Sequence, residues 1–481
     1  MNSFFVNIGK TVEEKIPNVE TPFSSFLSHP NNCVINMNPC SNIEIRKLIS
    51  KIEVSKASGP FSIPSKLLKM FKDIFVLPIT SIINKSLAEG IFPDILKSAS
   101  VHPIFKKNDK TNCANYRPIS LLSNISKIFE RAMYDRIELF LNDFDLIYEN
   151  QFGFRKKHST SHALISIVEE IRNNLDNKIF SCAVFVDLEK AFDTVNHKIL
   201  LKKLDHYGIS GIPNSWIQSY LSNRSQAVTV NGVKSSQKPI TCGVPQGSIL
   251  GPLLFLIYIN DMNEALLNSR VFHFADDTNL LFSHENPEKL HNIINQELKI
   301  LSNWLCANRL SLNVSKTEFI IFRPPKKNLS DRVTLKLNGV KLFESPKIKY
   351  LGIILDSRLS WKFHTHELSK KLSRSLGMIY KIRNLCTPEV LRSLYYSLFN
   401  SHLTYGLAVW GNCNRIYSEK LRILQKNLSV LLLLPILMQI PNQYLKNWES
   451  WNLMISIIVN LPHSCGIMIM TPCQVPLVGF L

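Results

Sequence analysis

The sequence predicts an α+β fold in which short buried strands alternate with longer amphipathic helices. Residues 182–186 and 271–275 are apolar runs rich in β-branched and aromatic side chains, which is typical of buried strands. Over longer stretches, such as residues 290–301, apolar residues recur at helical spacing. Hydrophobic residues make up 45% of the 481 residues, enough for a large core and for two or three domains.

The first part of the chain predicts a lead-in segment followed by helices. Residues 1–42 are polar, with scattered prolines and no clear period. A helix is expected to begin at Ser41 or Asn42, because both residue types cap helices and apolar residues follow at helical spacing. We assign a helical segment to residues 43–87. Further on, residues 115–118 (NYRP) predict a turn.

Each predicted strand runs directly into acidic residues. The first strand ends at Asp187, and a helical period then covers residues 191–204 and stops at Gly208. The second strand ends at Asp276 and Asp277, after which strand character resumes. Two aspartates therefore lie at the tip of a predicted hairpin.

The remaining predicted elements are a hairpin, an apolar stretch and three helices. The hairpin surrounds Asn231-Gly232, the strongest short hairpin signal. One helix begins at Asn286-Pro287, where proline fits the first turn. In chain order, these elements are a helix through Ile128, Ala132 and Ile137, the hairpin over residues 226–241, the apolar stretch 249–259, the helix from residue 286 and a basic amphipathic helix over 368–382.

Asp187, Asp276 and Asp277 converge if their strands are neighbours in one sheet. Three converging carboxylates repel one another, so they need a cation to remain ionised together. Carboxylate oxygens suit Mg²⁺, with Mn²⁺ as a second candidate, and two such ions assist in-line displacement at phosphorus. An isolated Asp-Asp pair at a hairpin tip is more often a solvated turn. The prediction of a two-metal site therefore rests on the three aspartates together.

The charge balance favours a polyanionic partner. Lys and Arg number 56 against 37 Asp and Glu, for a formal net charge of +19. Nucleic acid and an anionic membrane surface both fit that excess. No apolar run is long enough to span a bilayer, so we expect no membrane insertion. The ten cysteines form no C-x-x-C pair, which gives a zinc site little support and fits a reducing compartment.

The acidic segments belong to an ordered series of short motifs. Residues 185–193 (FVDLEKAFD) and 274–277 (FADD) flank residues 243–252 (GVPQGSILGP). The other motifs are residues 115–120 (NYRPIS) and 151–155 (QFGFR) upstream, and 312–313 (LN), 316–317 (KT) and 350–352 (YLG) downstream. Over residues 43–427 this series resembles the reverse transcriptases of jockey-like non-LTR retrotransposons. The resemblance implies a right-hand polymerase fold of fingers, palm and thumb, with an antiparallel palm sheet flanked by helices.

The same resemblance divides the chain and suggests its partners. It places fingers and palm in residues 88–355 and a thumb-like helical region in residues 356–427. The implied reaction adds dNTPs to a DNA primer, or to nicked target DNA, on an RNA template. The bound RNA–DNA hybrid would be read by its backbone and shape. Relatives carry an upstream endonuclease domain, which we do not expect within residues 1–45.

The resemblance also assigns roles near the carboxylates. Asp187, Asp276 and Asp277 match the metal-binding triad. Phe192 matches the bulky gate that crowds a 2′-hydroxyl and so selects deoxynucleotides, although its spacing also fits ordinary helix core. Lys316 matches the position suggested as the acid for the leaving pyrophosphate, and an exposed loop lysine explains it equally well.

Further residues match positions that contact the substrates. Gln246 and Gly247 match the loop that lines the template and the incoming base, with a plain turn as the alternative. Lys106 and Arg117 match finger positions that grip the triphosphate, and the planar fork of arginine suits phosphate. For Lys106, a solvated basic turn is an equal alternative. The primer grip is matched by Leu351 and Gly352.

Three features depart from the family or leave alternatives open. Where the family has an Asp-Gly pair, this chain has Phe61 and Ser62. A group II intron maturase or telomerase-type polymerase is the related enzyme class to be weighed, and a non-catalytic nucleic-acid-binding relic is the other. Residues 428–481 form an atypical apolar tail with one Lys, one Glu and no Arg or Asp, which we interpret as frame-shifted or wrongly spliced sequence.

Overall fold

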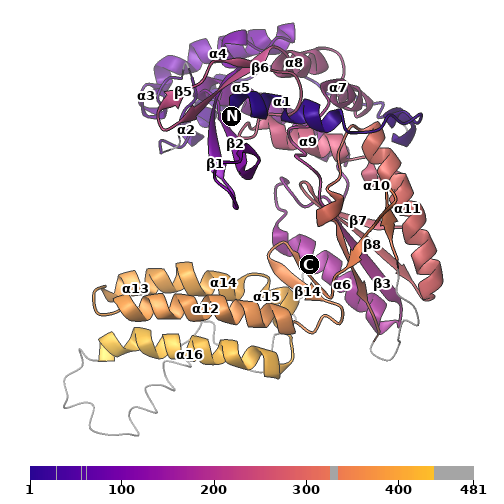
Figure 1. Cartoon of the computed structure of the whole chain (residues 1–481). Helices are drawn as coiled ribbons and strands as arrows, with labels where there is room; N and C mark the ends of the chain where they lie inside the picture. Colours follow the sequence, from indigo (N-terminus) through magenta and orange to yellow (C-terminus); the bar gives the residue numbers. More distant parts are fainter. Residues whose placement is uncertain (29, 56, 61, 325–333, 438–481) are drawn as a thin grey trace. The chain divides into compact units, whose positions relative to one another are not determined.

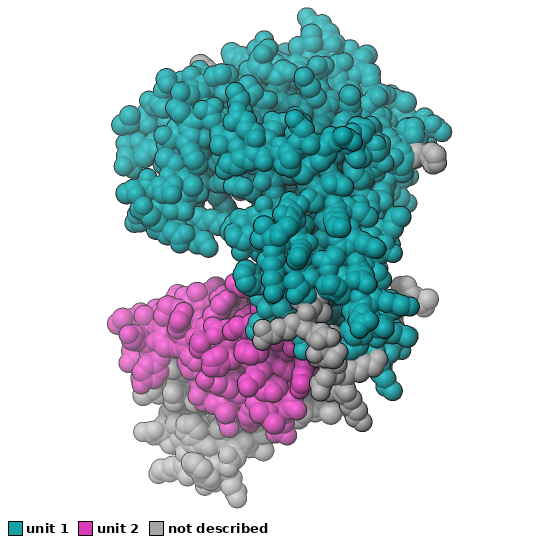
Figure 2. Space-filling view, turned by 45° about the vertical axis from the view of Figure 1, so that its right-hand side comes forward, with its two compact units in different colours: residues 1–346 teal, residues 347–481 magenta. Residues whose placement is uncertain are grey.

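The chain forms two compact units, Met1–Pro346 and Lys347–Leu481 (Figure 2). The computed structural model describes residues 1–28, 30–55, 57–60, 62–324 and 334–437. The first unit combines two five-stranded sheets with many helices, and the second is mainly helical (Figure 1). The predicted α+β class is therefore confirmed.

Helices make up much of the first unit. Helix α9 is apolar on all sides and most of its residues are buried, as expected for a helix inside a large core. In chain order the helices are α1 (Asn2–Glu13), α2 (Asn42–Lys51), α3 (Ser65–Met70), α4 (Lys72–Glu89), α5 (Asn124–Asp143), α6 (Thr160–Asp176), α7 (His197–His206), α8 (Ile212–Leu221), α9 (Leu250–Ile259), α10 (Met262–Ala265) and α11 (Pro287–Ala307).

Two helices begin at the predicted caps. The Ser41 side chain accepts a hydrogen bond from Glu44 N at the start of α2, and the Asn286 side chain accepts hydrogen bonds from Glu288 N and Lys289 N at the start of α11. Helix α7 begins at His197, later than its apolar period predicted. The reason is that the Asn196 side chain caps α7, while the preceding residues are bound to another loop instead of continuing a helix.

Helix α1 lies in the segment from which no regular structure was predicted. Phe5, Ile8 and Val12 are buried on one of its faces. Gly9 allows close packing, because a Cβ atom there would lie 2.2 Å from Asp193 O. The Asn2 side chain donates to Gln226 O, so α1 is attached to the first sheet.

The first sheet has strand order β2-β1-β4-β5, with β6 paired to β4. The predicted hairpin is confirmed, because Asn231 and Gly232 have φ of 49° and 80° and connect β4 to β5. Residues 115–118 do not form the predicted turn: Tyr116 begins β2 and pairs with Phe105 of β1. The strands are β1 (Ser98–Phe105), β2 (Tyr116–Leu121), β4 (Arg224–Val230), β5 (Val233–Lys234) and β6 (Lys238–Ile240).

The second sheet carries the three aspartates and has the order β12-β9-β3-β8-β7. It was expected to be antiparallel, but it is mixed, because β12 pairs with β9 in parallel. In this pair Phe343 lies opposite Glu318 and Glu344 lies opposite Phe319, so the two strands run in the same direction. The strands are β3 (Phe180–Val186), β7 (Arg270–Phe274), β8 (Asp277–His284), β9 (Glu318–Phe322), β10 (Lys336–Leu337), β11 (Val340–Lys341) and β12 (Phe343–Glu344).

The second unit consists of a short hairpin and a group of helices. The predicted basic helix is confirmed as α12, and the Asp356 carboxylate accepts hydrogen bonds from backbone N–H groups, including that of Trp361, just before it. The elements are β13 (Lys347–Tyr350), β14 (Ile353–Asp356), α12 (Lys362–Ile382), α13 (Pro388–Leu394), a π-helical turn (Tyr395–Asn400), α14 (Ser401–Thr404), α15 (Leu407–Trp410) and α16 (Arg415–Leu437).

Helix α16 continues without a break across residues 427 and 428, where the composition of the sequence changes. Leu428 is buried. Most of the apolar tail, residues 438–481, lies outside the described residues, as does Phe61. Within the described part of the chain, no helix combines the length and the apolar character required to cross a bilayer.

Candidate active site

Asp187 and Asp277 lie at the same end of two neighbouring strands. β3 pairs with β8 in an antiparallel register that places Val186 opposite Thr278. Asp187 directly follows Val186, and Asp277 directly precedes Thr278. The β7–β8 hairpin closes through Ala275 and Asp276, as predicted, with Phe274 opposite Asp277. The sheet therefore brings the three aspartates to one edge.

The β7–β8 turn is shaped by the residue 151–155 motif. Ala275 has a positive φ of 59°, an unusual backbone conformation for a residue with a side chain. The Gln151 side-chain oxygen accepts hydrogen bonds from Ala275 N at 3.2 Å and from Gly153 N at 2.9 Å. Phe152 N also donates to His273 O. These contacts fix the turn that carries Asp276.

A second segment fixes the backbone at Asp187. Asn313 N donates to Asp187 O at 2.8 Å, and Glu189 N donates to Ser311 O at 2.8 Å. This pairing brings Lys316 into the site, with its Nζ 3.1 Å from Asp187 Oδ2. Lys316 is thus paired with one of the three carboxylates.

The carboxylates influence one another electrostatically. The pKa of Asp277 is raised to about 6 by the loss of surrounding water and by the carboxylates of Asp276 and Asp187. The pKa of Asp276 is also raised, first by desolvation and then by Asp187. Both side chains nevertheless keep exposed surface at the turn. The fold thus gathers carboxylates at a place where their surroundings disfavour the charged form.

Basic residues share this neighbourhood. The pKa of Lys106 is lowered by desolvation and by the charges of Arg117 and Lys316. Arg117 and Lys106 in turn oppose the upward shift of the pKa of Asp276. Lys106 follows β1, and Arg117 lies on β2 opposite Ile104, so the two come from adjacent strands of the first sheet. The predicted triphosphate-binding residues therefore face the aspartates.

The donor set suits a hard divalent cation, since all three side chains offer carboxylate oxygens that repel one another. In the described part of the chain, no three His, Cys, Asp or Glu side chains lie close enough to hold a metal ion as arranged. Asp187 is paired with Lys316 instead. The structure therefore brings the triad to one edge of the sheet but does not place the carboxylates at ligand positions.

Phe192 packs within the same unit. Its ring stacks on Phe255 with centroids 4.6 Å apart and meets Phe154 edge to face at 6.2 Å. The side chain is only partly buried. One face of the ring therefore packs in the core while another part stays accessible. This arrangement fits both a steric gate against a 2′-hydroxyl and an ordinary core residue.

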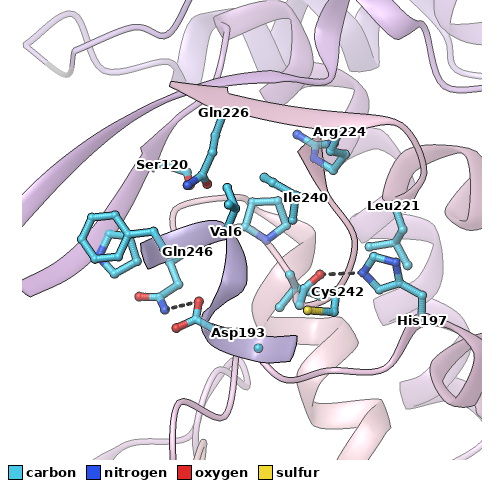
Figure 3. Close-up of a pocket in the computed structure, with 16 residues that line it drawn as sticks. Val6, Ser120, Asp193, His197, Leu221, Arg224, Gln226, Ile240, Cys242 and Gln246 are labelled. Carbon is cyan, nitrogen blue, oxygen red and sulfur yellow. Dashed lines mark hydrogen bonds between the residues drawn. The ribbon is translucent and has the colours of Figure 1, made fainter. Parts of the chain in front are cut away.

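Gln246 and Gly247 lie in a loop docked on β2. Ser120 N donates to Gln246 O at 2.7 Å. Gly247 has φ of 119°, and a Cβ atom there would lie 2.5 Å from Ser120 O, so both the conformation and the space require glycine. The Gln246 side chain donates from Nε2 to Asp193 Oδ1 at 2.8 Å (Figure 3).

Leu351 and Gly352 form the turn between β13 and β14 in the second unit. Both have positive φ, 42° and 86°. The Tyr405 hydroxyl donates to Leu351 O at 2.6 Å and supports this turn.

Three residues that support this site had no predicted role. Gln151 and Asp193 lie inside motifs that were recognised, but nothing in a linear pattern shows which backbone or side chain each one contacts. Glu130 is the third. Its carboxylate accepts hydrogen bonds from Ile249 N and Leu250 N and so caps α9 after the Gln246 loop.

Comparison with known proteins agrees with the motifs. Residues 104–355, more than half of the chain, match the family model described as reverse transcriptase (RNA-dependent DNA polymerase). The chain is 30% identical over 414 residues to the RNA-directed DNA polymerase from mobile element jockey of Drosophila melanogaster, covering 83% of this chain and 44% of that protein.

Two other relatives show the same pattern. The probable RNA-directed DNA polymerase from transposon BS of Drosophila melanogaster is 28% identical over 435 residues, covering 86% of this chain and 46% of the relative. The Pol polyprotein of retrotransposable element R1 from Bradysia coprophila is 24% identical over 381 residues, or 76% and 37% of the two chains. This chain thus spans less than half the length of these relatives. It belongs to the reverse transcriptase family of RNA-dependent DNA polymerases.

Proposed function

We propose that this chain is the RNA-directed DNA polymerase of a non-LTR retrotransposon, which adds dNTPs to a primer 3′-hydroxyl on an RNA template. The observation that carries the proposal is the group of Asp187, Asp276 and Asp277 at one edge of the sheet, with Lys106 and Arg117 nearby. Carboxylates that can hold metal ions, beside cations that can bind phosphate, suit a reaction between a nucleoside triphosphate and a hydroxyl.

In this reaction the primer 3′-oxygen forms a bond to the α-phosphorus of the dNTP. The bond from that phosphorus to the bridging oxygen breaks, pyrophosphate leaves, and the hydroxyl proton passes to solvent. Asp187, Asp276 and Asp277 would hold two divalent cations, Mg²⁺ or Mn²⁺. These ions would offset the negative charge of the triphosphate and stabilise the attacking and leaving oxygens. Family membership itself implies a divalent-metal-dependent polymerase.

The remaining residues bind and orient the substrates. Lys106 and Arg117 would pair with the triphosphate, since both are exposed and face the aspartates. Lys316 lies within hydrogen-bond distance of Asp187 and would supply a proton to the leaving pyrophosphate. The accessible part of Phe192 would exclude a 2′-hydroxyl.

Residues elsewhere would contact the template and primer. Gln246 and Gly247 would line the template and the incoming base, and Leu351 and Gly352 would hold the primer. We assign fingers and palm to residues 88–355 and a thumb to residues 356–427, in a right-hand arrangement. The template would be RNA, and the primer DNA or a nicked target.

Primer extension tests the proposal. The chain should extend a labelled DNA primer annealed to RNA when dNTPs and Mg²⁺ are supplied, and a chelator should stop the reaction. Binding of the primer–template without extension, over a range of Mg²⁺ and Mn²⁺ concentrations, would instead show a non-catalytic nucleic-acid-binding relic.

A further inference from the structure

Asp193 has no part in the chemistry above, yet its carboxyl is held inside the protein beside the Gln246 loop. Its Oδ1 accepts from Gln246 Nε2 at 2.8 Å, and its Oδ2 is buried without a hydrogen-bond partner among the described residues. Figure 3 shows the two side chains facing each other. Both line a small cavity of about 40 Å³. A buried carboxyl oxygen without a partner is costly, so a fold that keeps one calls for an explanation.

The main chain of Asp193 is closely confined. A Cβ atom at Gly9 would lie 2.2 Å from Asp193 O, and one at Gly243 would lie 2.7 Å from the same oxygen. Asp193 N donates to Lys190 O at 2.8 Å. Two glycines and a hydrogen bond therefore fix the position from which the carboxyl reaches Gln246.

The Asp193 carboxylate also determines which way the Gln246 amide points. An ionised carboxylate can only accept hydrogen bonds, so the amide nitrogen of Gln246 must face it. The amide oxygen then points away, as Figure 3 shows. Because Gln246 O separately accepts from Ser120 N, the loop is fixed at its backbone and at the end of its side chain.

We propose that Asp193 is a positioning residue that orients the Gln246 amide so that its oxygen, a hydrogen-bond acceptor, faces the nucleotide-binding side of the loop. Asp193 acts through Gln246 and does not touch the substrate. The inference rests on the proposed polymerase function, in which Gln246 lines the incoming base. Asp193 thereby decides whether Gln246 presents a hydrogen-bond acceptor or a donor to the incoming base.

Asp193→Asn is the informative variant, because an amide at this position can meet Gln246 with either its oxygen or its nitrogen. The orientation of Gln246 is then no longer determined. We expect the KM for dNTP to rise roughly tenfold, the size of one lost charge-assisted hydrogen bond, while kcat changes much less. Asp205→Asn, an exposed carboxyl on α7, is the matched control and should leave both constants unchanged.

A double-mutant cycle shows whether Asp193 works through Gln246. In a Gln246→Met background, which lacks the amide, Asp193→Asn should change the KM by less than twofold. The pair Asp193→Asn with Gln246→Glu reverses donor and acceptor, so it should recover much of the loss caused by either change alone. Equal losses in both backgrounds, with no recovery in the reversed pair, would overturn the inference.

Denaturant unfolding of the same variants gives a readout that does not depend on activity. Asp193→Asn and Gln246→Met should be coupled by roughly tenfold in the unfolding equilibrium constant. An uncoupled pair refutes the inference even if the enzyme is active. A wild-type chain that shows this coupling but never extends a primer would refute the proposed function and leave the hydrogen bond established.

Discussion

Gly153→Ala tests how the β7–β8 turn depends on the residue 151–155 motif. The new Cβ atom would lie 2.2 Å from Ala275 N and 2.8 Å from the carbonyl carbon of Phe274, whereas ordinary contacts begin at 3.4 Å. Both neighbours are backbone atoms and cannot rotate away. The turn carrying Asp276 must therefore move by about 1 Å, a displacement that can lower an enzymatic rate by roughly 100-fold.

The assay is primer extension over a range of Mg²⁺ concentrations. We expect Gly153→Ala to lower the extension rate by about that factor and to require more Mg²⁺, because the displaced carboxylates match a cation less well. Gly339→Ala is the control: Gly339 has φ of 77° but no neighbour within 4 Å. It should lose about 1–2 kcal/mol of folding free energy through backbone strain and keep its activity.

If a folded Gly153→Ala protein extends primers at the wild-type rate with the wild-type Mg²⁺ requirement, the turn does not depend on this close approach. Circular dichroism and thermal unfolding of both glycine variants establish that the comparison is between folded proteins.

Four further predictions address single residues. Asp276→Asn keeps the shape of the side chain but removes its charge, so extension should fall by about a thousandfold or more in a chain of unchanged melting temperature; extension near the wild-type rate would contradict the assignment. Phe192→Ala should admit ribonucleotides, and unchanged selection between dNTPs and rNTPs would leave this ring as core alone. Lys203 and Asp261 are fully buried together, so Lys203→Met should destabilise the fold by about 3–5 kcal/mol in denaturant unfolding, and a loss under 1 kcal/mol would show that Asp261 tolerates being unpaired. His364 is buried, and its pKa is lowered from 6.5 to about 4, mainly by desolvation. The unfolded chain therefore binds a proton at this position more readily than the folded one, so roughly 3 kcal/mol of folding stability, fully present above pH 6.5, should be lost as the pH falls toward 4. His364→Gln should lose less stability over that range, and melting temperatures that fall in parallel for the two proteins would contradict this.

Elements that are determined by residues close together in the sequence were predicted correctly. Ser41 and Asn286 indicate helix starts because a capping side chain binds backbone groups two or three positions away. Asn231-Gly232 announces a hairpin because both residues accept positive φ. The strand before Asp187 was visible as an apolar run of the right length.

The features that were missed depend on distant partners. Helix α1 buries three apolar side chains and has a central Gly9, and its packing against Asp193 cannot be read from residues 1–13. The late start of α7 follows from hydrogen bonds between residues 192–195 and residues 243–244. The parallel pairing of β12 with β9 is likewise a contact between residues about 25 positions apart, Phe343 and Glu318. In each case the deciding contact is made by residues far apart in sequence.

The motifs of the candidate site hold one another in place. The three carboxylates alone therefore describe only part of the site. Gln151 holds Ala275 beside two aspartates, Asn313 holds the backbone of Asp187, and Asp193 holds Gln246. Each contact joins two motifs that are separated in sequence but adjacent in space. A substitution in one motif should therefore disturb the geometry of another. A double-mutant cycle should show coupling between Asp193 and Gln246, the pair in which both partners are side chains. The order of the motifs along the chain identifies the family, whereas these contacts determine how the site is assembled.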